Sequence, residues 1–145
     1  MDKAFDKSSR KTAQNALMFS STNPAMVMSI DPLLIAAYSS DIDAVAMLQY
    51  PQQMLEIYNL EKYDKLITVN GYLTAVIHKD LFPGPESSRT WKDFFPTIVD
   101  FLTSDYIQLR KHKQNIPEVL WNYVKCLGED YLKNGGGKCR KEWFN

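Results

Sequence analysis

Residues 65–79, KLITVNGYLTAVIHK, consist of two short apolar runs that are separated by Asn70-Gly71. Asparagine and glycine both accept the positive φ angles that a type I′ turn requires. The pattern therefore predicts a β-hairpin whose strands run over Lys65–Val69 and Tyr72–His78. A two-stranded hairpin is only marginally stable in water, so we expect a third strand beside it.

The apolar run Ala44–Tyr50, which Pro51 closes, is the candidate for that third strand. Ser40 and Asp43 have the spacing of a helix capping box, and Ala, Met, Leu and Gln favour helix, so a helix is one interpretation. An unbroken apolar run of this length is also typical of a buried strand. We favour the strand, because the segment that begins at Pro51, PQQMLEIYNL, predicts a short helix. A strand–helix–strand unit then supplies the hairpin with its partner.

Helix signals occur on both sides of this region. Asp31 at an N-cap position, with Pro32 behind it, predicts a first short helix in DPLLIAAYSS. In the second half, Pro96 is expected to interrupt a helical pattern and to restart a helix over residues 96–113. A second long helix is predicted between Asn115, a good N-cap, and Asn134-Gly135, a typical C-terminal cap.

These elements predict an α+β fold with a small, three-stranded, mainly antiparallel sheet, packed against two long C-terminal helices and short helices. The predicted strands are Ala44–Tyr50, Lys65–Val69 and Tyr72–His78. Residues 1–15 are polar and aperiodic and are expected to be flexible. Residues 16–134 are expected to form one globular α+β domain, and residues 135–145 a flexible basic and aromatic tail.

The composition supports a substantial core and limits the choice of partner. Of 145 residues, 45% are hydrophobic and 12% aromatic, which is enough apolar material for a core without disulfides or metals. Seventeen basic residues balance seventeen acidic ones, which argues against nucleic acid as the main partner. Between Thr22 and Glu61, however, there are five acidic residues and no Lys or Arg. This acidic segment is either a solvated face or a surface for a basic partner or for the protein's own basic ends.

The cysteines and the N-terminal residues bear on the compartment. Two cysteines, Cys126 and Cys139, do not make a disulfide framework, so a reducing compartment is expected. No apolar run approaches the ~20 residues that span a bilayer, and no membrane partner is expected. The first residues lack the apolar core of a secretory signal. Their Ser, Lys and Arg content is typical of a transit peptide, but Asp2 and Asp6 are not. We expect a cytoplasmic protein, with organellar import as the alternative.

Motifs for cofactors and metals fail at defined positions. NGGGKC, residues 134–139, resembles the end of a phosphate-binding loop in its Gly-Lys pair. That loop needs Gly at the position of Leu132 and Ser or Thr at the position of Cys139. Asp41 and Asp43 match the first two ligand positions of a calcium loop, but its twelfth position, which requires Glu, holds Gln52. The two histidines and two cysteines show no metal-ligand spacing. No cofactor and no metal site are therefore expected.

His78 is the best candidate for a catalytic group if the protein is an enzyme. It ends an apolar strand and precedes Asp80, a carboxylate that would orient its imidazole. The alternative is a strand-end histidine that faces solvent. Cys126 is expected to be a buried structural thiol on an amphipathic helix, and the chain contains no GxSxG nucleophile motif.

Aromatic residues supply the candidate binding surface. Trp91, Phe94 and Phe95 follow a Pro-rich loop, and they either anchor that loop to the core or form an exposed patch. Trp143 and Phe144 follow a run of glycines and suit docking onto another protein or a second copy of this chain. The leading hypothesis is a non-enzymatic protein–protein interaction or assembly domain that uses apolar and aromatic surface together with the acidic segment.

The alternative is a small-molecule-binding domain or small enzyme with a pocket between the sheet and helix 96–113. Polar groups from the strand ends would line this pocket with Arg110 opposite them, namely Asp41, Asp43, His78 and Asp80. A third hypothesis is a nucleic-acid accessory protein that uses Arg110, Lys111, Lys113 and the tail.

Overall fold

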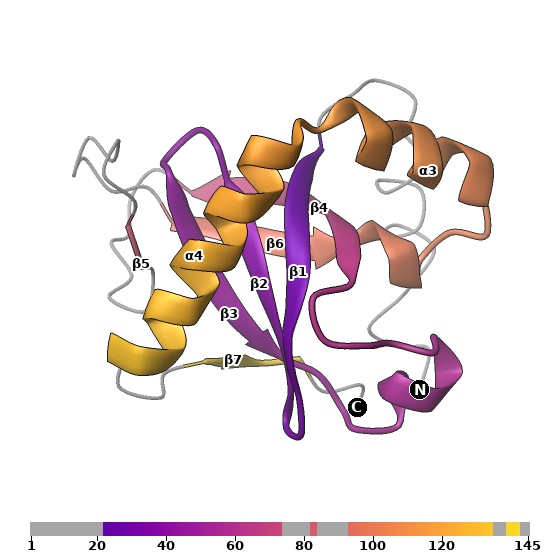
Figure 1. Ribbon diagram of the computed structural model, residues 1–145, viewed down its shortest axis with the longest axis horizontal. Helices are drawn as coiled ribbons and strands as arrows, with labels where there is room; N and C mark the ends of the chain where they lie inside the picture. The colour runs from indigo at the N-terminus through magenta and orange to yellow at the C-terminus, as the bar shows by residue number, and fades with distance from the viewer. Residues whose placement is uncertain (1–21, 74–81, 84–92, 135–138, 143–145) are drawn as a thin grey trace.

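A computed structural model describes residues 22–73, 82–83, 93–134 and 139–142, and these residues form a curled sheet flanked by helices (Figure 1). The strands are β1 (Asn23–Ile30), β2 (Leu33–Ser39), β3 (Ala44–Gln49), β4 (Lys65–Leu73), β5 (Phe82–Pro83), β6 (Asp93–Ile98) and β7 (Arg140–Lys141). The helices are α2 (Met54–Ile57), the 3-10 turn η2 (Val99–Phe101), α3 (Tyr106–Asn115) and α4 (Glu118–Asn134). The strand order is β5-β3-β2-β1-β4-β6, antiparallel throughout, and β7 pairs with β3 in parallel.

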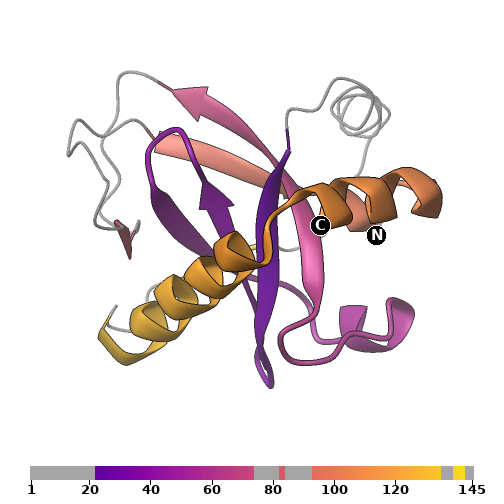
Figure 2. The same ribbon diagram turned by 45° about the horizontal axis from the view of Figure 1, so that its top comes forward.

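The sheet curls so strongly that β4 and β6 cross behind β1–β3 (Figures 1 and 2). Although β1 separates β4 from β2 in the strand order, the Asn70 side chain of β4 donates a hydrogen bond to the carbonyl of Tyr38 in β2 at 2.8 Å. The inner face of the curl carries four alanines: Ala25, Ala37, Ala44 and Ala46. Short side chains at these positions let the two halves of the sheet approach each other at the density of a protein interior.

Strands β1–β3 are buried on both faces, because successive side chains of a strand point to opposite sides. On one face, Met26 and Met28 belong to a cluster with Trp121 of α4. On the inner face, Val27 belongs to a second cluster with Phe101 of η2. This double burial explains why the sequences of β1–β3 are nearly continuous apolar runs rather than alternating ones.

Gly128 brings α4 close to the sheet. A Cβ atom at this position would lie 2.8 Å from the sulfur of Met28, well inside normal contact distance. Met28 is itself fully buried beneath the helix. The glycine therefore favours the close contact between α4 and β1, at the expense of helix propensity.

The predicted three-stranded sheet is wrong, and the hairpin at Asn70-Gly71 is the main reason. Strand β4 continues through both residues to Leu73, and they pair with Pro96 and Phe95 of β6. Asn70 does not have the positive φ of a type I′ turn. Its side chain is used inside the sheet, where it accepts a hydrogen bond from the Thr68 hydroxyl at 3.0 Å. Long-range pairing has thus overridden the local turn preference.

The three predicted strands fare differently. Ala44–Tyr50 does contain a strand, β3 (Ala44–Gln49), and Lys65–Val69 forms the first part of β4. Of the predicted strand Tyr72–His78, Tyr72 and Leu73 end β4, and residues 74–78 lie outside the described residues. Within the residues that the structure describes, none of the three pairs with another, because β1, β2, β5, β6 and β7 supply their neighbours.

Two predicted helical segments are strands. Asp31-Pro32 forms the turn between β1 and β2 instead of a helix start, and the apolar residues that follow enter β2. Residues 93–98 form β6, with Pro96 opposite Asn70. In β2, and at Ile98 of β6, the apolar side chains that suggested a helix face are buried in the sheet instead. Proline is compatible with β6 because this strand is the last in the order of the described strands, and edge strands tolerate proline.

The expectation of two long C-terminal helices is also wrong. Helix α3 has 10 residues and begins at Tyr106 rather than at residue 96. Helix α4 has 17 residues and begins at Glu118, so Asn115, the predicted N-cap, is instead the last residue of α3. The α+β class is nevertheless correct. Residues 1–15 and most of 135–145 lie outside the described residues, so the division into domain and tails stays a prediction. No helix in the described ranges has the length and apolar character to cross a membrane.

Candidate functional site

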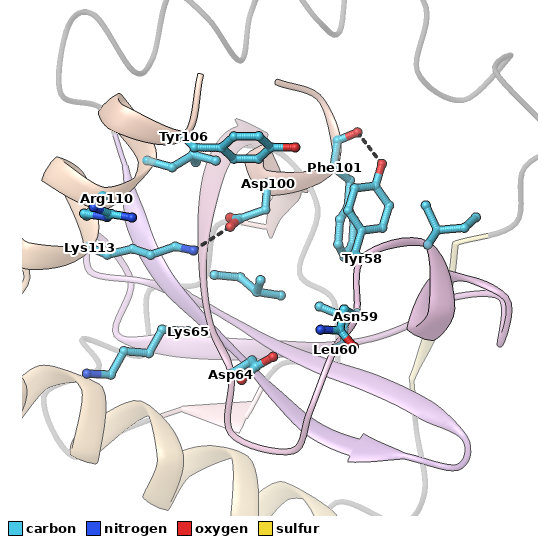
Figure 3. A pocket seen from close by; sticks show the side chains of 13 residues that line it. Tyr58, Asn59, Leu60, Asp64, Lys65, Asp100, Phe101, Tyr106, Arg110 and Lys113 are labelled. Atoms are coloured by element: carbon cyan, nitrogen blue, oxygen red, sulfur yellow. Dashed lines mark hydrogen bonds and ion pairs between the residues drawn. The ribbon is translucent and has the colours of Figure 1, made fainter. Parts of the chain in front are cut away.

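A pocket of about 650 Å³ lies beside α3, where that helix approaches the start of β4 and the segment that follows α2 (Figure 3). Residues 57–60 form one wall and residues 64–66 the edge of the sheet. Residues 100–101 of η2 contribute to the lining, and four residues of α3 form the opposite wall: Tyr106, Leu109, Arg110 and Lys113. The pocket thus joins segments that are about fifty residues apart in sequence.

The α3 wall follows from helical geometry. Its four lining residues are spaced i, i+3, i+4 and i+7, so they share one face of the helix. Asp105 fixes the start of the helix, since its carboxylate accepts the backbone N–H of Gln108 at 3.2 Å. Leu109 anchors this face in the core, and the other three side chains are left at the pocket.

The opposite wall is held to η2 by an aromatic contact. The Tyr58 ring lies 4.6 Å from that of Phe101, centroid to centroid, and the Tyr58 hydroxyl donates to the Phe101 carbonyl at 3.1 Å. Asn59 follows with φ of 51°, a left-handed conformation that asparagine tolerates well. These features fix the course of residues 57–60 along the pocket.

Both carboxylates of the pocket serve structural hydrogen bonds. Asp100 accepts the backbone N–H of Ile67 at 2.7 Å and the ammonium of Lys113 at 2.7 Å, so it extends the β4–β6 ladder and ties α3 to it. Asp64 accepts the backbone N–H of Glu61 at 2.8 Å. Both carboxylates therefore already accept hydrogen bonds from within the protein, which does not suit a free catalytic acid or base.

The cations of the pocket lie together. Figure 3 shows Arg110, Lys113 and Lys65 along one side, across from Tyr58 and Asn59. Lys113 pairs with Asp100, and Lys65 pairs with exposed Glu118 at 2.9 Å. Arg110 is exposed and makes no ion pair with any residue that the structure describes. It is the cation best placed to receive a group from outside the chain.

Large apolar side chains are exposed on two walls of the pocket. Ile57, at the end of α2, is 51% exposed, and Tyr106, at the start of α3, is 69% exposed. Between them, Leu66 and Phe101 are buried and contribute to the lining. The pocket therefore combines apolar surface with a positive flank.

Asp43, predicted as a binding residue, has a structural position instead. It is buried in the turn between β2 and β3 with φ of 49°. Its Oδ1 accepts the hydroxyls of Tyr38 at 2.8 Å and Tyr123 at 2.7 Å, so it connects the sheet to α4. The two rings meet edge to face, 5.8 Å apart. Asp41, in the same turn, is exposed.

The predicted site residues that the structure describes do not all lie in one place. Arg110 lines the pocket, whereas Asp41 and Asp43 do not. Phe94 lies in β6 opposite Tyr72. The other candidates, His78, Asp80, Trp91, Trp143 and Phe144, lie outside the described residues. The candidate pair of His78 and Asp80 therefore stays a prediction.

Sequence reasoning missed most of the pocket. Tyr106 and Leu109 are visible in the sequence as helical repeats, but only as core positions, and Ile57 as part of a short helix. The spacing of residues 106, 109, 110 and 113 was the available signal for a shared face. Nothing local indicates that residues 57–60 lie across from that face, because the curl of the sheet brings them there.

The two cysteines lie outside the pocket. Cys126 is exposed, contrary to the expected buried thiol, and Cys139 is half-buried with its sulfur 3.4 Å from Oε1 of Gln49. Within the described ranges, no three His, Cys, Asp or Glu side chains are grouped so that they could hold a metal ion.

Two titratable groups meet where the chain beyond α4 joins β3. The backbone N–H of Glu142 donates to the carbonyl of Gln49 at 2.7 Å. Burial raises the pKa of the Glu142 carboxyl above its ordinary value, although Arg140 acts in the opposite direction. Burial, and secondarily the negative charge of Glu142, raises the pKa of Tyr50 well above 10.

Comparison of the chain with protein-family models, with curated proteins and with solved structures gave no match. Function is therefore argued from the geometry of the pocket.

Proposed function

We propose that the protein is an interaction domain that binds a segment of a partner protein in the pocket beside α3. The observation that carries this proposal is the exposure of Ile57 and Tyr106 on two walls of one pocket. Single exposed apolar residues are common on protein surfaces, but two that share a concave site provide a place for an apolar side chain of a partner.

The residue types support binding to protein. Tyrosine and arginine are enriched among the residues that dominate interface energetics, and this pocket has Tyr58, Tyr106 and Arg110. The walls are fixed by internal contacts, namely the Tyr58–Phe101 pair and the Asp100–Lys113 ion pair. Such preorganisation lowers the entropic cost of binding.

A small-molecule ligand is the second candidate. The volume of about 650 Å³ lies within the range of roughly 300–1,000 Å³ that is typical of small-ligand sites. The same walls and the same cations would hold such a ligand, and the experiment must therefore distinguish it from a peptide.

The test is a selection of random dodecapeptides displayed on phage, with the full chain as bait. We expect peptides that bind the wild type and bind at least about tenfold more weakly to the double variant Ile57→Ser/Tyr106→Ser, because truncation of interface anchors typically has effects of this size. Ile107→Ser is the matched control, since Ile107 is 73% exposed beside Tyr106 but does not line the pocket.

The outcomes separate the candidates. Peptides that bind the wild type and the double variant equally would show that the pocket is not the docking site. Failure to enrich any peptide, together with pocket-centred NMR shifts in a screen of small organic anions, would replace the proposal with the small-molecule candidate. Melting temperatures of all variants serve as the check that each is folded.

A further inference from the structure

We propose that the partner segment carries an acidic side chain that Arg110 binds, next to the apolar side chain that enters the pocket. This inference rests on the proposed function and adds to it the chemistry of the ligand. Two features of the pocket support it: the arrangement of charges in its lining and the position of Arg110 relative to Tyr106 on α3.

The charges of the pocket leave one cation for a partner. Lys113 and Asp100 neutralise each other at 2.7 Å, and Asp64 is engaged by a backbone N–H. Lys65 is paired with Glu118, which lies outside the lining. Arg110 has no such partner among the described residues and lies on the same side as both lysines. An acidic side chain completes an ion pair with Arg110, whereas a basic one would meet a like charge.

Arginine is also the right donor for a carboxylate. Its planar guanidinium offers parallel N–H groups that can bind both oxygens of a carboxylate at once. Arg110 is exposed, so its guanidinium stays hydrated in the free protein and folding carries no desolvation cost for it. Binding next to the apolar walls would then exclude water from the ion pair and strengthen it.

The spacing on α3 sets the spacing in the ligand. Tyr106 and Arg110 are four residues apart, so their Cβ atoms are roughly 5–6 Å from each other. In an extended peptide, residues i and i+2 point to the same side and are separated by about 6.4–6.8 Å. A peptide that contacts both α3 residues therefore has its acidic residue two positions from its aromatic or aliphatic residue.

The experiment repeats the peptide selection with two charge-reversal baits. Arg110→Glu changes the residue in the pocket, and Lys111→Glu changes the adjacent exposed residue of α3, which does not line it. We expect wild-type and Lys111→Glu baits to enrich Asp or Glu two positions from an apolar residue. We expect the Arg110→Glu bait to enrich Lys or Arg at that position.

A double-mutant cycle then measures the contact directly. The best wild-type peptide and its Glu→Gln or Asp→Asn form are titrated against the wild type, Arg110→Gln and Lys111→Gln. We expect the peptide change to weaken binding about five- to tenfold to the wild type and to Lys111→Gln, and less than about twofold to Arg110→Gln.

Each failure has its own signature. Enriched peptides that depend on Ile57 and Tyr106 but show no acidic preference would overturn this inference and leave the proposed function in place. An acidic preference that persists with the Arg110→Glu bait would assign the anion to another cation. Peptides that bind independently of Ile57 and Tyr106 would overturn the proposed function itself.

Discussion

Helices α4 and α3 are consecutive in the chain and both lie beside the sheet, but they contact it to very different extents. Helix α4 lies across β1–β3 and buries five residues: Trp121, Val124, Leu127, Gly128 and Tyr131 (Figure 1). All ten residues of α3 are described, and Leu109 alone is buried. The difference indicates a division of roles, in which α4 stabilises the sheet and α3 keeps most of its surface for the pocket.

The polar contacts of the two helices differ in the same way. Tyr123 of α4 donates to the buried carboxylate of Asp43, in the turn between β2 and β3. Lys113 of α3 pairs with Asp100 at the edge of the pocket. Truncation of a buried side chain of α4 is therefore expected to lower stability, and truncation of an exposed pocket residue of α3 to affect binding rather than stability.

The largest expected effect comes from aromatic truncation in each helix. Trp121→Ala should lower the free energy of unfolding by about 3–5 kcal/mol, because it empties a fully buried site. Tyr106→Ala, on an exposed ring, should change it by less than about 0.5 kcal/mol. Urea denaturation measures both. Similar losses for the two variants would contradict the division of roles.

An intermediate effect is expected at the contact between α4 and the β2–β3 turn. Asp43→Ala should destabilise by about 1–3 kcal/mol, because it removes the acceptor of two tyrosine hydroxyls. Asp43→Asn should be much milder, since its amide oxygen still accepts and asparagine tolerates the positive φ. Chemical denaturation of both variants checks this prediction. Equal losses of unfolding free energy would show that the negative charge of Asp43, rather than its role as a hydrogen-bond acceptor, matters at this site.

The smallest effect is expected from pH, and it should arise outside both helices. Burial raises the pKa of folded Glu142 above its unfolded value near 4.5, so the folded state binds more protons. Stability should therefore fall as pH rises from about 4.5 through the raised folded pKa, because the folded state must then hold a buried carboxylate.

Glu142→Gln isolates this contribution. The variant should show a flatter dependence of unfolding free energy on pH than the wild type over pH 4.5–8, in parallel denaturation series. A pH dependence that is unchanged in the variant would assign the titration to another group.

The accuracy of sequence-based prediction followed how local the information was. Helix α4 could be predicted because its apolar stripe lies within its own residues. The Asn70-Gly71 signal is equally local but was overridden, because pairing with β6 and the bond to Tyr38 involve residues far away in the chain. β2 was mistaken for a helix because a run buried on both faces shows no strand periodicity.

The pocket shows the same limit. The sequence predicts Arg110 on a helix beside a pocket, and the structure places it at one. The sequence could not show that Asp41 and Asp43 lie away from that pocket, or that Ile57 lines it. The curvature of the sheet determines which of these residues reach the pocket. The binding role of Arg110 stays a prediction.

The parallel pairing of β7 with β3 has a consequence for the order of folding. The β1–β2 and β2–β3 hairpins join neighbouring segments, whereas Leu48 pairs with Arg140 across more than half of the chain. Closing so long a loop is entropically unfavourable until its surroundings exist. We therefore expect the two hairpins to assemble early and β7 to dock last, as the step that completes the edge of β3.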